Sequence, residues 1–514
     1  MNKDAALTVA PNDWDWTGFL QNGSDIGVSA WMEETELRDR SGDVAELRWL
    51  LRGIRDRLAL YRDAFPDHRF ERELEAAFAR QAYGLEERAQ GYEGRPETCD
   101  WDAYLTLKYE IRLLYKQLGA IVAGSDWQSP CKTWGGPDTD FAEEVGFVQE
   151  EQGTYERGYG SEAVKAYEEA SLDAFYPMSG QTRERSVRFL TTSGMKALEL
   201  ALVAYKSTTR EALPFYIQEG FYGEGIELTN TLLNDPLELD VAGLYAKVEA
   251  NAPVGGLLVD PGVCWPVRPA VDLARLFEGL SRHRQEQPLY VIVDRTLTSV
   301  ANPLFAKYAD RLPSHVVLVS VESGIKHMQY GFDLANAGFL VATGRALEAA
   351  ERREQWVTLL ALLDAGADPV AVRQLPAPDL QRVIARLSRL NRNACWMDAF
   401  LGHAVREEKV SVYFRSVDPS PDYKLDGREW IGPLFYIQFP GYRSVAQYQS
   451  WIDSFVVSAP AEEHFVSGGS FGFDTFRMNV VSDADGTEAA LRVSVGRDPF
   501  VRMLSKLRYM YGRM

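Results

Sequence analysis

The chain has 514 residues, of which 46% are hydrophobic and 25% are charged, as in folded globular proteins and unlike disordered or fibrous ones. Its 55 basic and 74 acidic residues give a net charge of −19, which disfavours nonspecific binding to nucleic acid or anionic lipid. The four cysteines form no CxxC pair, and there is neither an apolar N-terminal stretch nor an apolar run of about 18 residues. We therefore expect a soluble cytoplasmic protein without disulfides, a thiolate metal site or a membrane span.

The N-terminal part of the chain has apolar residues at helical spacing, which predicts a mainly helical extension over residues 1–140. The first helix is predicted to begin at Asp43 as its N-cap, with Glu46 three residues later, and to reach Tyr61. Two further helices and a connector containing Gly, Pro and Ser follow, over residues 70–78, 100–118 and 124–137. Packing or subunit contact is the expected role of these helices.

Short apolar strands then alternate with helical stretches such as residues 195–205 and 271–283. The predicted strands are residues 187–190, 215–218, 256–259, 289–293, 316–321 and 338–342. This alternation predicts an α/β large domain with a mainly parallel sheet over residues 141–385.

A helical passage over residues 346–403 leads into a second alternating pattern. Its predicted strands are residues 410–415, 435–439, 476–481 and 491–495. They indicate a smaller α+β C-terminal domain over residues 386–514.

Three groups of residues follow predicted strands of the large domain, where open α/β sheets place their ligands. Ser193-Gly194-Met195 precedes a helix, so this turn either cradles a phosphate or only caps the helix. Asp294 either keeps a ring nitrogen protonated or caps the next segment. Lys326 is either a surface group or a Schiff-base lysine whose pKa desolvation lowers.

Further short motifs join these residues in chain order. They are Tyr155-Glu156-Arg157, Ser193-Gly194-Met195, Tyr222-Gly223, Val293-Asp294-Arg295-Thr296, Ser323 with Lys326, Asp333 seven residues later, and Arg492-Val493-Ser494-Val495-Gly496. In these motifs the chain resembles the cysteine and methionine metabolism family of fold type I pyridoxal-phosphate enzymes. That family includes cystathionine γ-synthase, cystathionine lyases and methionine γ-lyase. The resemblance covers residues 155–514 and leaves the helical extension unexplained.

The resemblance implies a three-layer αβα fold with pyridoxal 5′-phosphate held as a Schiff base on Lys326. Within it, the turn formed by Ser193, Gly194 and Met195 is expected to bind the cofactor phosphate. Ser323 is expected to bind the cofactor as well.

The remaining motifs imply contacts with the cofactor ring, the substrate and a second subunit. Asp294 is expected to contact the pyridine nitrogen, and the ring of Tyr222 to stack on the pyridine face and to assist proton transfer. Arg492 is expected to bind the substrate carboxylate. Tyr155 and Arg157 are expected to reach the cofactor phosphate of a neighbouring subunit, which implies a homodimer or homotetramer.

Three residues depart from the family pattern. Ile325 replaces a threonine whose hydroxyl contacts the phosphate. Trp265 stands where an asparagine contacts the phenolic oxygen of the cofactor, so it either changes the electronics of the ring or provides only a packing contact. Tyr330 falls where a glycine is usual. These departures favour a specialised amino-acid pathway over the standard substrates of the family.

The expected activity is that of a lyase or transferase acting on an L-amino acid with a leaving group at Cγ, by γ-elimination or γ-replacement. The leaving group is a thiol, an acylated oxygen or a halide, and the sequence does not choose among them. A β-lyase acting on an S-substituted cysteine and a transaminase are the alternative enzymes. A catalytically inactive interaction protein that keeps the fold is the alternative of another class.

Overall fold

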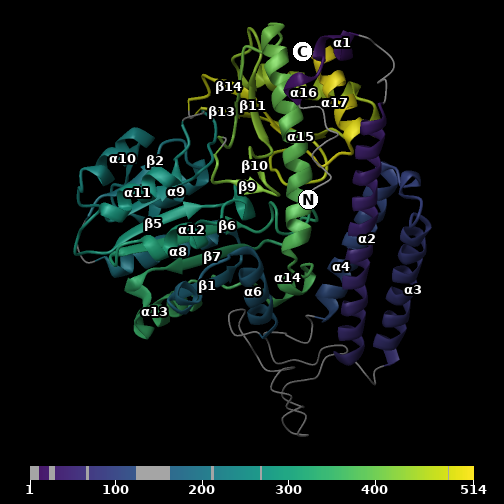
Figure 1. Ribbon diagram of the computed structural model, residues 1–514. Coiled ribbons are helices and arrows are strands. Elements are labelled where there is room, and N and C mark those ends of the chain that lie inside the picture. Colours follow the sequence, from purple (N-terminus) through teal and green to yellow (C-terminus); the bar gives the residue numbers. More distant parts are fainter. Residues whose placement is uncertain are drawn as a thin grey trace.

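The computed structural model describes residues 11–21, 29–64, 69–122, 162–209, 213–266, 269–418, 420–483 and 485–514. It consists of a seven-stranded sheet flanked by helices, a smaller five-stranded sheet, and a layer of long N-terminal helices (Figure 1). Residues 124–137, predicted as a connector, lie outside the described residues. No helix in these ranges is long and apolar enough to cross a membrane.

The large sheet has the strand order β1-β7-β6-β5-β4-β2-β3. Its strands are β1 (Ser186–Thr191), β2 (Phe215–Gln218), β3 (Leu237–Leu239), β4 (Gly256–Val259), β5 (Leu289–Asp294), β6 (Val316–Ser323) and β7 (Gly338–Thr343). Only β7 runs antiparallel to its neighbours, so the predicted mainly parallel sheet is confirmed. The edge strand β3 was not predicted from the sequence because it has three residues and Leu237 is half exposed.

Helices cover both faces of this sheet, which explains why its central strands are continuous apolar runs. The helices of this part of the chain are α6 (Glu162–Phe175), α7 (Gly180–Glu184), α8 (Gly194–Thr208), α9 (Gly223–Leu232), α10 (Val241–Glu249), α11 (Leu273–Arg282), α12 (Leu304–Tyr308), α13 (Ala350–Leu362) and α14 (Pro369–Gln374). Along β5, Val291 and Val293 belong to one core cluster, whereas Tyr290 and Ile292 belong to the other. The sheet thus separates two cores.

The small sheet has the order β12-β13-β14-β11-β8 and packs against the C-terminal helices. Its elements are β8 (Val412–Arg415), β11 (Leu434–Gln438), α16 (Val445–Ser458), β12 (Val466–Ser467), β13 (Arg477–Ser482), β14 (Ala489–Ser494) and α17 (Phe500–Arg513). A two-stranded hairpin, β9 (Lys424–Leu425) with β10 (Arg428–Glu429), lies beside it. Helix α15 (Leu380–Arg406) joins the two sheets and contains the predicted domain boundary at residue 385.

Three long helices form what we call the N-terminal layer: α2 (Ala30–Ala64), α3 (Arg69–Gly91) and α4 (Trp101–Val122) (Figure 1). Apolar residues of α2 and α4, including Leu47 and Ile111, belong to the same core cluster as Val291 of the large sheet. The short helix α1 (Trp16–Gln21) packs instead against α15, where the rings of Trp16 and Trp396 lie 5.8 Å apart. The predicted helical extension therefore shares the cores of the rest of the molecule.

One predicted helix start is wrong. Asp43 does not cap a helix, because α2 begins thirteen residues earlier at Ala30 and continues through Asp43. The Asp43 side chain is buried and forms ion pairs with Arg389 and Arg497. Acidic residues near the start of an apolar pattern resemble a cap in sequence, but here distant arginines pair with them. The third helix does begin as predicted, since Asp100 accepts a hydrogen bond from the Ala103 amide at 2.7 Å.

Candidate active site

A cavity of about 340 Å³ opens at the carboxyl edge of the large sheet, between that sheet and the small one. The turns that follow β1, β2, β4, β5 and β6 all contribute to it. Its lining includes eight residues that the sequence motifs single out: Ser193, Gly194, Met195, Tyr222, Asp294, Ser323, Lys326 and Arg492. Parallel strands bring their ends to one edge, so Ser193 and Ser323, which are 130 positions apart in sequence, converge.

The turn after β1 places the start of α8 at the cavity. Ser193 is the N-cap of α8, and its hydroxyl accepts a hydrogen bond from the Lys196 amide at 3.1 Å. Gly194 lies so close to β6 that a Cβ atom there would be 3.0 Å from Ser323. Gly194 and Met195 line the cavity with the positive end of the helix dipole. Ser193 thus caps the helix, and the helix start is also placed to bind an anion.

Two carboxyl groups follow neighbouring strands of the sheet. Asp294 ends β5, and Asp260 directly follows β4, whose Val259 pairs in register with Val293. Burial raises the pKa of Asp294 to about 6, although its carboxylate accepts the Thr296 amide at 2.8 Å. Burial and the nearby Asp294 raise the pKa of Asp260 well above its usual range. Asp294 therefore both caps the following turn and faces the cavity.

Lys326 reaches the cavity from the turn after β6. Its Nζ donates a hydrogen bond to the Ser470 hydroxyl at 2.6 Å. Burial and the nearby guanidinium of Arg492 lower the pKa of Lys326 from its usual value. A lysine with a lowered pKa has a larger neutral fraction, and the neutral amine is the form that attacks a carbonyl or accepts a proton.

The small sheet supplies the opposite wall of the cavity. Arg492 on β14 lies directly across from Asn479 on β13 and Tyr436 on β11 in the strand register. Its Nε donates to the Asn479 side-chain oxygen at 2.8 Å, which fixes the plane of the guanidinium. Tyr222 starts α9, and burial together with Glu224 raises its pKa, so the phenol is protonated. A fixed guanidinium and a neutral phenol thus face one cavity.

The structure does not bring every predicted residue together. Tyr155 and Arg157 lie outside the described residues. Asp333 does not line the cavity, and its backbone carbonyl accepts a hydrogen bond from Arg112 at 2.7 Å. Trp265 also lies outside the lining: its indole donates to the Glu488 carbonyl at 3.1 Å and packs near Tyr436. Of the two expectations for Trp265, the geometry favours a packing contact.

Sequence reasoning missed several residues of the cavity. Cys264, Asp260, Tyr436 and the loop residues Gly469, Ser470 and Phe471 line it. Asp260 follows an apolar strand as Asp294 does, and this repeated pattern was a usable signal. In the loop, the glycines at 468, 469 and 472 were the available sequence signal. Its approach to Lys326 depends on how the two domains pack, which the local sequence does not encode.

Known structures share this architecture. No protein-family model and no curated protein sequence matches the chain. The crystal structure of yeast cystathionine γ-lyase matches with 15% identity and a TM-score of 0.51, over 78% of this chain and 98% of its own. A methionine γ-lyase from Micromonospora echinospora, in its apo form, matches with 18% identity and a TM-score of 0.49, over 76% and 97%. At such identity the likeness to the yeast lyase shows the fold alone, and the predicted α/β class, fold type I, is confirmed.

Proposed function

We propose that this protein is a pyridoxal-phosphate enzyme that acts on an L-amino acid. The observation that carries the proposal is the convergence of Lys326, Asp294 and the start of α8 on one cavity. A lysine, a carboxylate and a helix N-terminus fit the aldehyde, the ring nitrogen and the phosphate of this cofactor. These three groups come from turns after β6, β5 and β1, so the fit does not depend on a single motif.

Each residue has a defined task in this proposal. The Ser193-Gly194-Met195 turn and Ser323 hold the phosphate, and the phenol ring of Tyr222 stacks on the pyridine. Asp294, ionised above its pKa of about 6, keeps the ring nitrogen protonated. When bound, the cofactor supplies an electron sink for the electron pair of the Cα–H bond.

Lys326 and Arg492 act on the substrate. Arg492 binds the α-carboxylate through the guanidinium that Asn479 orients. The neutral amine of Lys326 takes the Cα proton and, with Tyr222, serves the later proton transfers at Cβ. Departure of the group on Cγ follows, giving γ-elimination or γ-replacement. This reaction class is supported by the order of the sequence motifs.

The visible spectrum of the purified protein tests the cofactor assignment. We expect a visible absorption band with added pyridoxal phosphate, and borohydride reduction followed by peptide mapping should locate the adduct on Lys326. Lys326→Ala should abolish the adduct and lower turnover by a factor of ~10⁴ or more, while leaving the fold intact. Absence of a band in the reconstituted protein would overturn the proposal.

The products identify the reaction. Among L-amino acids with leaving groups on Cβ or Cγ, we expect 2-oxobutyrate from the γ-substituted substrates. Pyruvate from S-substituted cysteines would instead establish β-elimination, and accumulation of pyridoxamine phosphate would establish transamination. An altered spectrum without exchange of the Cα proton into deuterium would identify an inactive binding protein.

The proposal also keeps the predicted assembly. Tyr155 and Arg157 complete the phosphate site of a neighbouring subunit in a homodimer or homotetramer. Sedimentation analysis of the full chain should therefore give a mass of two or four subunits, and mixing Arg157→Ala with Lys326→Ala chains should restore a fraction of the activity.

A further inference from the structure

The loop between β12 and β13 joins the cavity to the N-terminal layer. Gly469, Ser470 and Phe471 of this loop line the cavity, and Ser470 accepts the hydrogen bond from Lys326. Gly472 lies directly against the main chain of the lysine, since a Cβ atom there would be 1.6 Å from the Lys326 carbonyl oxygen. This loop therefore packs against both the main chain and the side chain of Lys326.

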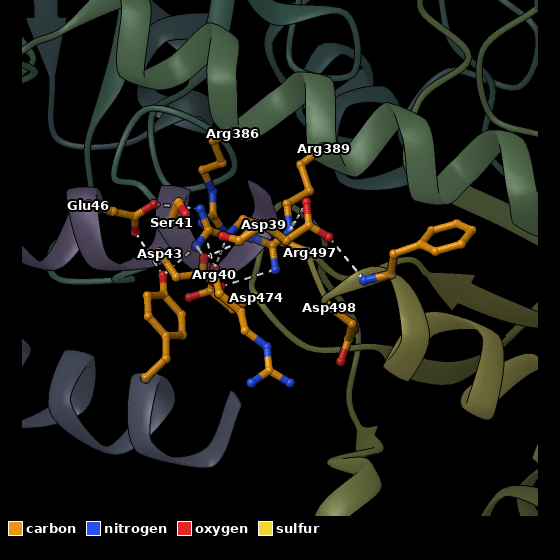
Figure 2. Close-up of polar contacts among 12 residues, drawn as sticks. Asp39, Arg40, Ser41, Asp43, Glu46, Arg386, Arg389, Asp474, Arg497 and Asp498 are labelled. Carbon is orange, nitrogen blue, oxygen red and sulfur yellow. Dashed lines mark hydrogen bonds and ion pairs between the residues drawn. The ribbon is translucent and has the colours of Figure 1, made fainter. Parts of the chain in front are cut away.

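Buried charges hold the far end of the same loop. The carboxylate of Asp474 accepts hydrogen bonds from Arg386 of α15 at 2.5 Å and from Lys108 of α4 at 2.8 Å. Arg386 also donates to the Gly472 carbonyl at 2.9 Å. Figure 2 shows Asp474 and Arg386 within a cluster that includes Glu46 of α2 and Arg497.

Lys108 connects this loop to the lysine segment as well. Its ammonium donates to Asp474, to Glu46 at 2.6 Å and to the Tyr330 carbonyl at 2.7 Å. Tyr330 stands four residues after Lys326 with a φ of 54°, a left-handed conformation that is unfavourable for tyrosine. The Lys108 side chain is only 4% exposed, so the three hydrogen bonds that its ammonium donates lie inside the protein.

A second residue of α4 makes a parallel contact. Arg112 donates to the backbone carbonyls of Phe332 and Asp333. One face of α4 thus contacts residues 330–333. Through Asp474 the same helix contacts residues 468–474 of the loop between β12 and β13, which we call the 468–474 loop. Both segments flank Lys326, and the hydrogen bonds from Lys108 that hold them are buried.

We propose that Lys108 is a positioning residue for the catalytic lysine, through which the N-terminal layer sets the 468–474 loop and the turn at Tyr330. This inference rests on the proposed function, and it assigns to the helical extension a task in catalysis. The ammonium bridges three segments: α2 at Glu46, the loop at Asp474 and the turn at Tyr330. Removing it leaves the Tyr330 carbonyl without this donor and removes one cation from the cluster around Glu46 and Asp474.

Lys108→Met tests the proposal, with Lys108→Arg as the charge-preserving variant. The control is Arg48→Met, which breaks a half-exposed pair with Glu93 in the same layer. In Lys108→Met we expect amide hydrogen exchange of residues 466–476 to rise ~10-fold or more in the cofactor-free protein. In the loaded enzyme the pH midpoint of the visible band should shift, and kcat should fall ~10-fold or more with a smaller change in KM.

Lys108→Arg should recover part of each effect, and Arg48→Met should match the wild type in all of them. A Lys108→Met protein that melts at a lower temperature but keeps wild-type loop exchange and the wild-type pH midpoint would overturn the proposal. If Lys108→Met does not fold, Arg112→Met tests how α4 positions the same turn. Its partners are main-chain carbonyls, so this substitution leaves no carboxylate unpaired. It should raise exchange over residues 328–334 and shift the same midpoint. A wild-type protein without a visible band would overturn the proposed function, whereas the loop exchange would still decide the role of Lys108.

Discussion

Ser470 combines an unfavourable main-chain conformation with a contact to Lys326. Its φ of 124° lies in a region that residues other than glycine rarely adopt, and its hydroxyl accepts the Lys326 hydrogen bond at 2.6 Å. Such a conformation is kept where the surrounding structure imposes it, here by the neighbouring Gly472 packed against the Lys326 carbonyl.

Ser470→Gly should distinguish the effect of the main-chain conformation on stability from the effect of the hydroxyl on catalysis. The glycine relieves the conformation, so we expect the free energy of unfolding to stay equal or to rise by about 1 kcal/mol. Loss of the hydroxyl should lower kcat about tenfold, because Lys326 loses its hydrogen-bond partner. Urea unfolding and steady-state kinetics measure the two effects. Ser470→Ala is the control, since it removes the hydroxyl but keeps the strained conformation, and a fully active Ser470→Gly protein would contradict the expectation.

Glu168 on α6 makes the stability depend on pH. Its carboxylate accepts the Leu190 amide at 2.6 Å, and burial raises its pKa from 4.5 to about 7. Between these values the folded chain binds more protons than the unfolded chain, so this group lowers stability as pH rises from about 4.5 to 7. Glu168→Gln keeps an acceptor oxygen without the charge. We expect it to increase the free energy of unfolding by about 1–2 kcal/mol at pH 8 and by little at pH 5.

Chemical denaturation at the two pH values checks this expectation. Glu162→Gln on the same helix is a suitable control, because among the described residues its side chain pairs with Lys165 at the surface. An equal gain from Glu168→Gln at pH 5 and pH 8 would contradict the assigned cause.

At the scale of elements, helices α8 and α16 both begin with a serine N-cap, but the start of α8 faces the cavity and the start of α16 does not. Ser193 caps α8 by accepting the Lys196 amide at 3.1 Å, and Ser444 caps α16 by accepting the Gln447 amide at 3.3 Å. Helix α8 begins at the cavity, whereas Ser444 is exposed. Comparing the two separates the structural role of a cap from binding of a phosphate.

Ser193→Ala and Ser444→Ala should each lower the free energy of unfolding by about 1 kcal/mol, because each removes one capping hydrogen bond. Only Ser193→Ala should also weaken binding of pyridoxal phosphate, by about tenfold, as followed by titration of the visible band. Equal cofactor affinity in the two variants would remove Ser193 from the phosphate site.

Except for the exposed edge strand β3, the strands of the large sheet were predictable because burial on both faces demands continuous apolar runs, as in residues 289–293. The cavity residues at their carboxyl ends followed from the same rule. The start of α2 was not predictable, because the polar residues around Asp43 are interior only in the presence of Arg389 and Arg497. A local pattern does not contain partners that stand more than 300 residues away in the chain.

At the scale of the whole molecule, the same reasoning explains why the helical extension could not be assigned from its sequence. Its amphipathic stripes specify that α2 and α4 pack against something, without specifying what. The structure supplies the partner: one core cluster runs from Leu47 and Ile111 to Val291, and ion pairs such as Arg392 with Asp39 fasten α15 to α2. The helical extension thus shares a hydrophobic core with the large sheet.

Helix α15 is continuous for 27 residues from one sheet to the other. Val383 and Leu387 are embedded in the core of the large sheet, while Met397 and Phe400 are embedded in that of the small sheet. A hinge between the two sheets would have to bend this helix and break consecutive main-chain hydrogen bonds. Helix α15 thus opposes rigid-body closure of the two sheets, so access to the cavity depends on the loops at its rim.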